Sequence, residues 1–216
     1  SFLQMVSNVS NELGDALSGT DTSERKGPKY PMQQGLLTVG DAKVLIWCLA
    51  ALSVASGLAM IWFSFGTLLC LEAFMLMILG AAAIFAAMRY TLGPSPYGYK
   101  GLGDIYVFVF FGLVSVLGGY FIVSHTLYWR ILLPAVAIGA FSTAVLNVNN
   151  IRDMKTDAAT RITTPLKIGL KWARVYQTAL IAAGWAAMTA YSCLRMYDLW
   201  HYLFVVTLPL FIIHLK

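Results

Sequence analysis

Long apolar segments alternate with polar connections along the whole chain. Five segments have the length and composition of a membrane-spanning helix, at about 42–64, 67–89, 104–124, 129–150 and 172–193. A sixth, 199–216, is barely long enough, and residues 1–17 resemble the last turns of a helix already under way. The pattern predicts an all-α fold, that of a polytopic helical membrane protein. Because no initiator methionine is present and the last segment stops early, we expect a single transmembrane domain over residues 1–216, truncated at both ends.

Composition favours a membrane protein over a soluble one. The 216 residues are 59% hydrophobic and only 12% charged, with a mean hydropathy of +0.71, whereas a soluble domain is about half apolar and a quarter charged. The net charge of +5 would favour nucleic-acid binding in a soluble protein, but here the cations gather in loops, so no nucleic-acid partner is expected. Cys48, Cys70 and Cys193 lie in or beside apolar segments without metal-ligand spacing, which predicts buried packing rather than disulfides or zinc.

The distribution of Lys and Arg predicts the orientation of the helices. Alternation puts the long connections 18–41, 90–103 and 151–171 on one side of the membrane. Thirteen of the fifteen Lys and Arg residues fall on that side, and only Arg130 and Arg195 fall on the other. Cationic loops face the cytoplasm by the positive-inside rule, so the long connections are predicted to be cytoplasmic.

A polar cluster follows directly after the fourth apolar segment. Asn150, Asp153 and Asp157 stand at i, i+3 and i+7, so they share one face if the helix continues. Two carboxylates one turn apart repel unless a cation lies between them, and hard oxygen ligands of this kind suit Mg²⁺. Ionisable groups at the end of a membrane helix indicate a functional site, the alternative being an ordinary solvated helix end.

A matching cluster lies near the start of the chain. Asn8, Asn11 and Asp15 again stand at i, i+3 and i+7. Glu12 lies beside them and Asp21 follows. Both clusters fall at the predicted cytoplasmic ends of apolar segments, so together they are suited to hold a metal–diphosphate group.

Polar clusters at the interface and an apolar body suit a substrate with a diphosphate head and a long hydrocarbon tail. Mg²⁺ would join the diphosphate to the carboxylates, and nearby cations would neutralise charge on the leaving group. The expected reaction is ionisation of an allylic diphosphate and attack by an electron-rich acceptor, with water excluded by apolar surroundings. The residues predicted to be catalytic are Asp15, Asp153 and Asp157, which with Asn11 are also the predicted metal ligands. The predicted substrate-binding residues are Asn8, Glu12, Asp21, Arg25, Lys26, Lys100, Asn150, Lys155 and Arg161.

The connection 90–103 is dense in Gly, Pro and Tyr. Such a loop can act as a lid over a membrane site, with Lys100 as a phosphate or carboxylate partner. It can equally be an interfacial turn whose tyrosines belong to the aromatic belt. The sequence leaves both interpretations open.

Three stretches carry a family resemblance. Residues 11–15, Asn-Glu-Leu-Gly-Asp, and residues 147–157, with Asn-Asn-Ile-Arg-Asp-x-x-x-Asp, are paired Asp-rich motifs. In both, and over essentially its whole length, the chain resembles the UbiA superfamily of intramembrane aromatic prenyltransferases. Residues 93–112 look like the branch of that superfamily that prenylates naphthoates. The departures from the superfamily pattern are Glu12 and Gly19, each in place of Asp, and Arg161 in place of Lys.

This resemblance implies a specific fold and reaction. The fold would have nine transmembrane helices around a central cavity capped by cytoplasmic loops, and this chain would lack the first helix, much of the second and the last. Two Mg²⁺ ions would bind a polyprenyl diphosphate, whose prenyl group passes to 1,4-dihydroxy-2-naphthoate with decarboxylation, giving demethylmenaquinone. The pattern of residues 35–43 and 149–155 suggests a bacterial sequence, so we expect the protein to lie in the lipid of a bacterial inner membrane.

Three alternatives remain from the residues alone. The acceptor could be 4-hydroxybenzoate, another aromatic acid or a glycerophosphate lipid, because no residue pattern dictates a naphthalene ring. An ion-coupled transporter would place its carboxylates near the bilayer midplane in broken helices, whereas here they lie at the ends of apolar segments. A fragment that binds Mg²⁺–diphosphate without turnover is the third alternative.

Overall fold

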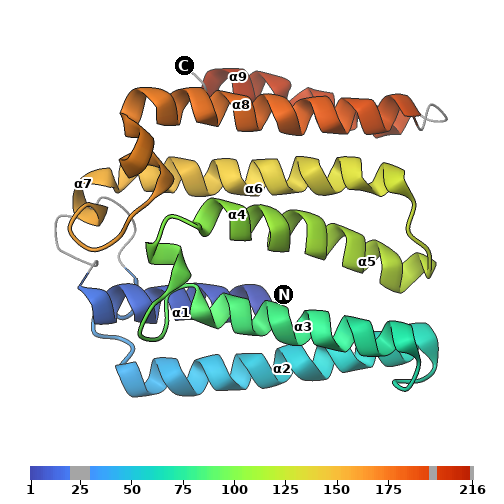
Figure 1. Ribbon diagram of the computed structural model, residues 1–216, viewed down its shortest axis with the longest axis horizontal. Helices are drawn as coiled ribbons and strands as arrows, with labels where there is room; N and C mark the ends of the chain where they lie inside the picture. Colours follow the sequence, from blue (N-terminus) through green and yellow to red (C-terminus); the bar gives the residue numbers. More distant parts are fainter. Residues whose placement is uncertain (20–29, 195–198, 215–216) are drawn as a thin grey trace. The chain divides into compact units, whose positions relative to one another are not determined.

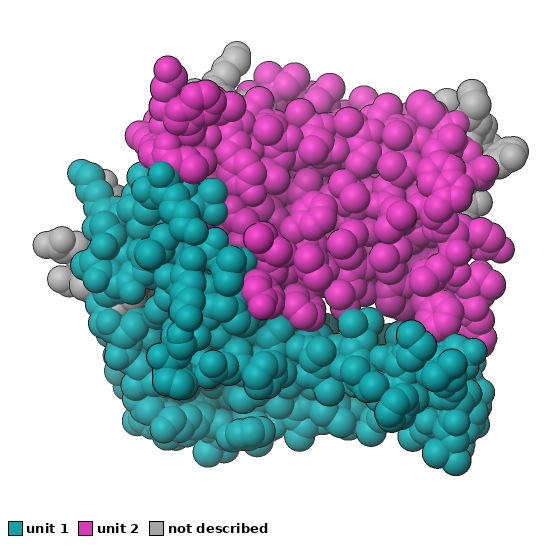
Figure 2. Space-filling model, viewed as in Figure 1, with its two compact units in different colours: residues 1–103, 152–167 teal, residues 104–151, 168–216 magenta. Residues whose placement is uncertain are grey.

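The computed structural model describes residues 1–19, 30–194 and 199–214 (Figure 1), which fall into two compact units. Unit 1 comprises residues 1–103 and 152–167, and unit 2 comprises residues 104–151 and 168–216 (Figure 2). The predicted all-α fold is confirmed, since the described residues form helices and turns with one isolated bridge pair.

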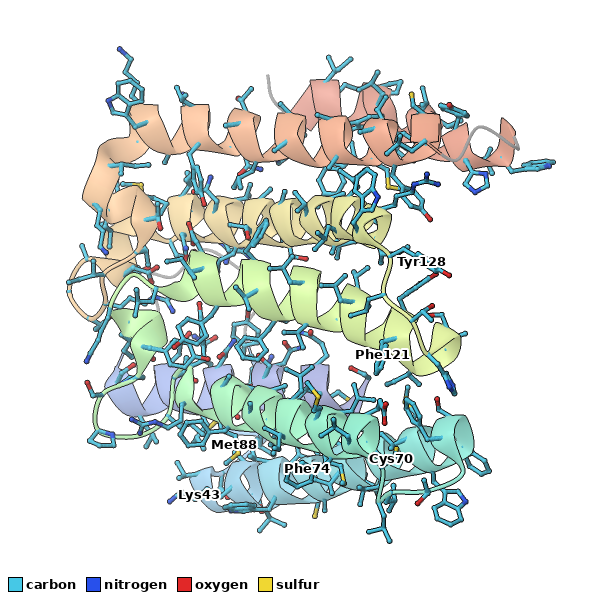
Figure 3. All side chains as sticks on the ribbon, turned by 45° about the vertical axis from the view of Figure 1, so that its right-hand side comes forward. Lys43, Cys70, Phe74, Met88, Phe121 and Tyr128 are labelled. Atoms are coloured by element: carbon cyan, nitrogen blue, oxygen red, sulfur yellow. The ribbon has the colours of Figure 1, made fainter. Side chains whose placement is uncertain are left out.

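Unit 1 is built on three helices, α1 (Phe2–Ser18), α2 (Val39–Phe65) and α3 (Leu71–Arg89), each packed against the other two. Their shared core is apolar and consists of Val6, Leu13, Ala42, Ile46, Leu49 and Ala50. In Figure 3, Lys43 near the start of α2 and Met88 near the end of α3 lie at the same end of the antiparallel pair. Phe74 on α3 is more than half exposed, as expected of a side chain that faces lipid.

Local signals fix where the helices of unit 1 begin. Thr38 caps α2 by accepting the Asp41 N–H, while the Asp41 carboxylate accepts the Thr38 N–H, which forms a capping box. This cap starts α2 three residues before the predicted boundary. Cys70 caps α3 through its Sγ, and Cys48 and Cys193 are exposed, so the prediction of buried cysteines is wrong. The reason is that lipid, unlike water, accepts an outward-facing apolar thiol.

Unit 2 begins with one long apolar span made of α4 (Gly103–Val107), the π-helical stretch η2 (Phe108–Val114) and α5 (Ser115–Ser124). The short η3 (Trp129–Ile131) leads into α6 (Leu132–Arg152). Gly112 lies so close to Gly139 of α6 that an added Cβ would come within 2.6 Å of the Gly139 Cα, so only a residue without a side chain fits there.

The last elements are α8 (Thr164–Leu194), η4 (Leu199–Thr207) and α9 (Leu208–His214). The helical dihedrals of α8 break at Gly169, where φ is 78° and ψ is 161°. The prediction of a polar connection to residue 171 is wrong in its second half, because α8 already starts at Thr164. Pro165 in its first turn lacks an N–H that would have no partner there anyway.

Within the described residues, four helical stretches are long and apolar enough to cross a membrane: Val39–Phe65, Leu71–Arg89, Gly103–Ser124 and Trp129–Arg152. They match the first four predicted segments to within a few residues. The fifth predicted segment lies inside α8, which is less apolar because polar residues such as Gln177 and Thr178 interrupt it. The sixth corresponds to a shorter apolar helix, Trp200–His214.

Candidate active site

The first carboxylate of the site lies in the last turn of α1. Asp15 is only 7% exposed, and its Oδ1 accepts a hydrogen bond of 2.8 Å from the Tyr99 hydroxyl. The helix stops just beyond it, where Gly19 adopts a left-handed conformation and donates its N–H to the Asp15 carbonyl oxygen. The Ser18 hydroxyl donates to the same carbonyl oxygen and lies 3.1 Å from the Tyr99 hydroxyl. Hydrogen bonds therefore hold both the backbone carbonyl and the side chain of Asp15 in place.

Arg161 joins the two acidic motifs within unit 1. Its Nη2 lies 2.8 Å from Asp157 Oδ1, and its Nη1 lies 3.4 Å from Asp15 Oδ1. The guanidinium carbon also lies 5.9 Å from the centre of the Tyr99 ring. Removing carboxylates from water is costly unless a cation compensates them, so one guanidinium between the two carboxylates lowers that cost. Arg161 therefore links one carboxylate of each acidic motif.

Asp157 is the most deeply buried acid of the site, with an exposed fraction of 0%. It ends the short helix α7 (Met154–Asp157), and its carbonyl oxygen accepts the N–H groups of Thr160 and Arg161. This tight turn brings the Arg161 side chain back to the carboxylate four residues earlier. The local backbone thus sets the Asp157–Arg161 ion pair.

Asp153 lies at a break in the helix rather than on a continuous face. Because α6 ends at Arg152 and α7 starts at Met154, the continuous helix on which a shared face of Asn150, Asp153 and Asp157 depends is interrupted at Asp153. The Asp153 carboxylate is 3% exposed and binds the guanidinium of Arg152 through two contacts of 2.7 Å. Asp153 has φ −95° and ψ 6°, and its carbonyl oxygen still accepts the Asp157 N–H at 2.9 Å, so the break is confined to one residue.

The other residues of the first motif are engaged in structural contacts. Glu12 Oε1 accepts the Met32 N–H at 2.7 Å, which ties the connection before α2 to α1. Asn11 Oδ1 lies 3.3 Å from the hydroxyl of Thr91, beside the polar end of α3. Asn8 is exposed and accepts a hydrogen bond from Gln4, so the structure does not bring it into the acidic cluster.

The remaining predicted residues are spread more widely. Lys100 and Lys155 are exposed, and Lys100 pairs with Ile162 in the isolated bridge. Asn150 is buried in α6 and belongs to unit 2. Three predicted residues, Asp21, Arg25 and Lys26, lie outside the described part of the chain.

Tyr99 is the residue of the site that the sequence analysis misses. It belongs to the short 3₁₀ turn η1 (Tyr97–Tyr99) in the connection after α3, and its carbonyl oxygen accepts the Ile162 N–H at 2.9 Å. Burial and the neighbouring Asp15 carboxylate raise the pKa of the Tyr99 hydroxyl well above its ordinary value, so it remains a protonated donor. The charge of the neighbouring Lys100 made it the predicted substrate-binding residue of this loop. In the structure, Tyr99 makes the contacts with Asp15 and Arg161.

The oxygen atoms of the site are of the kind that a hard metal ion binds. In the described part of the chain, no group of three or more His, Cys, Asp or Glu side chains gathers to hold an ion. The carboxylates of Asp15 and Asp157 share the Arg161 guanidinium as a partner. One or two carboxylates completed by water and phosphate oxygens are what Mg²⁺ prefers, so the ligand set fits a Mg²⁺–diphosphate group.

Unit 2 contains an apolar pocket of about 680 Å³ between α6, α8 and the last two helices. Phe141, Ile181 and Phe211 line it together with a few polar groups, among them Gln177, which lies 3.2 Å from a ring nitrogen of His214. Its lining suits a hydrocarbon chain better than a charged ligand.

The model of the UbiA prenyltransferase family matches residues 1–216. The chain belongs to this family. The resemblance drawn from the paired motifs is therefore confirmed, and the chain is a UbiA prenyltransferase. The four long apolar helices found among its described residues make it an integral membrane protein.

Named relatives within the UbiA family are similar over nearly the whole chain. The chain is 39% identical to "1,4-dihydroxy-2-naphthoate octaprenyltransferase" of Escherichia coli, over 98% of this chain and 68% of the relative. It is also 39% identical to the Haemophilus influenzae protein of the same name, over 99% and 69%. The Mycobacterium tuberculosis protein of that name is 38% identical, over 82% and 58%. No solved structure matches the chain significantly.

Proposed function

We propose that the chain transfers a polyprenyl group from a polyprenyl diphosphate to 1,4-dihydroxy-2-naphthoate. The carbon–oxygen bond to the diphosphate breaks, a carbon–carbon bond to the ring forms, and the acceptor carboxylate leaves as CO₂. The product is the quinol form of demethylmenaquinone. The observation that carries the proposal is the Arg161 guanidinium, which lies between one carboxylate of each acidic motif. Two relatives of the chain are named 1,4-dihydroxy-2-naphthoate octaprenyltransferase.

In this proposal, some residues of unit 1 bind Mg²⁺ and others bind the phosphate oxygens. Asp15 and Asp157, with Asn11 and Asp153, would hold Mg²⁺, and the ion would neutralise charge that builds on the leaving group. Arg161 presents a planar fork of donors that is able to bind phosphate oxygens in pairs, which a lysine cannot do. Lys100 and Lys155 are exposed on the same unit and are available to the outer phosphate.

The apolar surroundings would hold the tail and exclude water. The pocket of unit 2 offers a lining of the kind that a polyprenyl chain requires. Because the family model spans both units, we also propose that they belong to one domain. The Lys and Arg distribution supports a bacterial inner-membrane enzyme with the acidic motifs on the cytoplasmic side.

The acceptor is tested in membranes that carry the full-length protein. They are given a polyprenyl diphosphate and 1,4-dihydroxy-2-naphthoate, with or without Mg²⁺, and the lipid extract is analysed by mass spectrometry. We expect prenylated, decarboxylated naphthoquinol that requires Mg²⁺. Turnover with 4-hydroxybenzoate but not with the naphthoate would overturn the acceptor and leave prenyl transfer intact.

A further inference from the structure

Tyr99, in a third segment of unit 1, contacts Asp15 of the first acidic motif and also Arg161 and Ile162, which follow the second motif. Its hydroxyl donates to Asp15 of the first motif at 2.8 Å. Its ring lies under the Arg161 guanidinium, 5.9 Å from the ring centre to Cζ, and its carbonyl oxygen accepts the Ile162 N–H. The hydrogen bond between Tyr99 and Asp15 joins two residues that are 84 positions apart in the chain.

The contacts of Tyr99 also restrict the orientation of the Asp15 carboxylate and of the Arg161 guanidinium. A carboxylate with one oxygen bound by a phenol has fewer accessible orientations, so its other lone pairs are directed consistently. A guanidinium above an aromatic face is likewise held in one plane, and the interaction is strengthened when the pair is shielded from water. Arg161 is mostly buried, with a side-chain exposure of 12%, so this stacking takes place in a largely dry site.

We propose that Tyr99 is a positioning residue of the diphosphate site. It orients the Asp15 carboxylate through its hydroxyl and the Arg161 fork through its ring, so that metal and diphosphate oxygens meet a preformed arrangement. The proposal rests on the proposed function, since it assumes that Asp15 and Arg161 bind the Mg²⁺–diphosphate group.

Tyr99→Phe tests the hydroxyl while retaining the ring beneath Arg161. Tyr97→Phe is the matched control, because Tyr97 belongs to the same turn and its hydroxyl donates to the backbone oxygen of Ala86 rather than to an acidic side chain. The ring of Tyr97 also keeps its edge contact with Tyr90, 5.5 Å between ring centres, in the variant. Both variants lose one partly buried hydroxyl from the same turn, but only Tyr99→Phe loses a contact with the site.

The measurement is the binding of radiolabelled pyrophosphate to the purified full-length protein in detergent, at increasing Mg²⁺. For Tyr99→Phe we expect the half-saturating Mg²⁺ concentration to rise by about 10-fold, the lower end of the effect of removing a partner of a metal ligand. Tyr97→Phe should give the wild-type curve. In an Asp15→Asn background, Tyr99→Phe should have no further effect, because its hydroxyl acts through that carboxylate.

Each other outcome has a distinct meaning. An unchanged curve for Tyr99→Phe, or equal shifts for both tyrosine variants, would overturn the positioning role and leave the proposed function standing. A further loss in the Asp15→Asn background would overturn it too, since the effect would then be one of general folding. Wild-type protein that binds pyrophosphate without regard to Mg²⁺ would instead contradict the proposed function itself.

Discussion

Asp157→Asn should lower the rate of prenyl transfer by about 10²–10³-fold, the usual cost of removing one preorganised group that stabilises transition-state charge. The amide keeps the shape of the carboxylate but loses the charge that holds metal and orients Arg161. Because Arg161 retains Asp15 as a second partner, the substitution does not leave a buried cation uncompensated. We therefore expect near-normal amounts of protein in the membrane, and the comparison is of initial rates at matched protein levels.

Glu72→Gln provides the matched control. It makes the same change from carboxylate to amide at the exposed start of α3, away from the acidic cluster. We expect wild-type rates from this variant. Full activity of Asp157→Asn would remove Asp157 from the metal site, whereas loss of the protein from the membrane would point to a structural role instead.

Gly14→Ala should destabilise the protein by about 1–3 kcal/mol, the typical cost of overpacking a tight contact. An added Cβ at Gly14 would lie 2.5 Å from the Thr91 Cβ and 2.8 Å from its carbonyl oxygen. Helix propensity alone predicts the opposite, since Ala is better than Gly in a helix by about 1 kcal/mol. The steric term is larger because it involves backbone as well as side chain, and α1 has to move away from the loop that follows α3.

The control for this substitution is Gly57→Ala on α2. Gly57 has nothing within 4 Å of the position of an added Cβ, so only the helix propensity changes. Heating the detergent-solubilised variants and measuring the folded fraction by gel filtration should give a lower midpoint for Gly14→Ala and an equal or higher one for Gly57→Ala. Equal midpoints for the two variants would show that α1 and the Thr91 loop are not packed as closely as described.

The sequence predicted the apolar helices well because lipid imposes a requirement on every residue of a span. Uninterrupted apolar runs located the four long apolar helices of the described residues to within a few residues. The spacing of the acidic motifs selected Asp15 and Asp157, which the structure joins through Arg161. Both signals are local, and a local pattern is all that one sequence displays. The shared partner, Arg161, was also predicted to bind substrate, on the basis of its charge.

Contacts between distant segments could not be predicted in the same way. The hydrogen bond from Tyr99 to Asp15 depends on how a loop folds over a helix end, and no periodicity records it. The ion pair between Asp153 and its neighbour Arg152 is also absent from any helix pattern, because residues one apart do not lie on the same helical face. Glu12 has the charge of a ligand but binds the Met32 backbone, because an N–H without a partner had to be satisfied nearby.

The convergence of Asp15 and Asp157 on one diphosphate group is tested most directly by a double-mutant cycle on pyrophosphate binding. Wild type, Asp15→Asn, Asp157→Asn and the double variant are compared in purified full-length protein at saturating Mg²⁺. If both carboxylates act on one Mg²⁺–diphosphate group, each single variant should lose most of the binding and the double variant little more, since residues that act as a unit are not additive. Independent losses that add in free energy, or a single variant that binds as wild type does, would contradict a shared site.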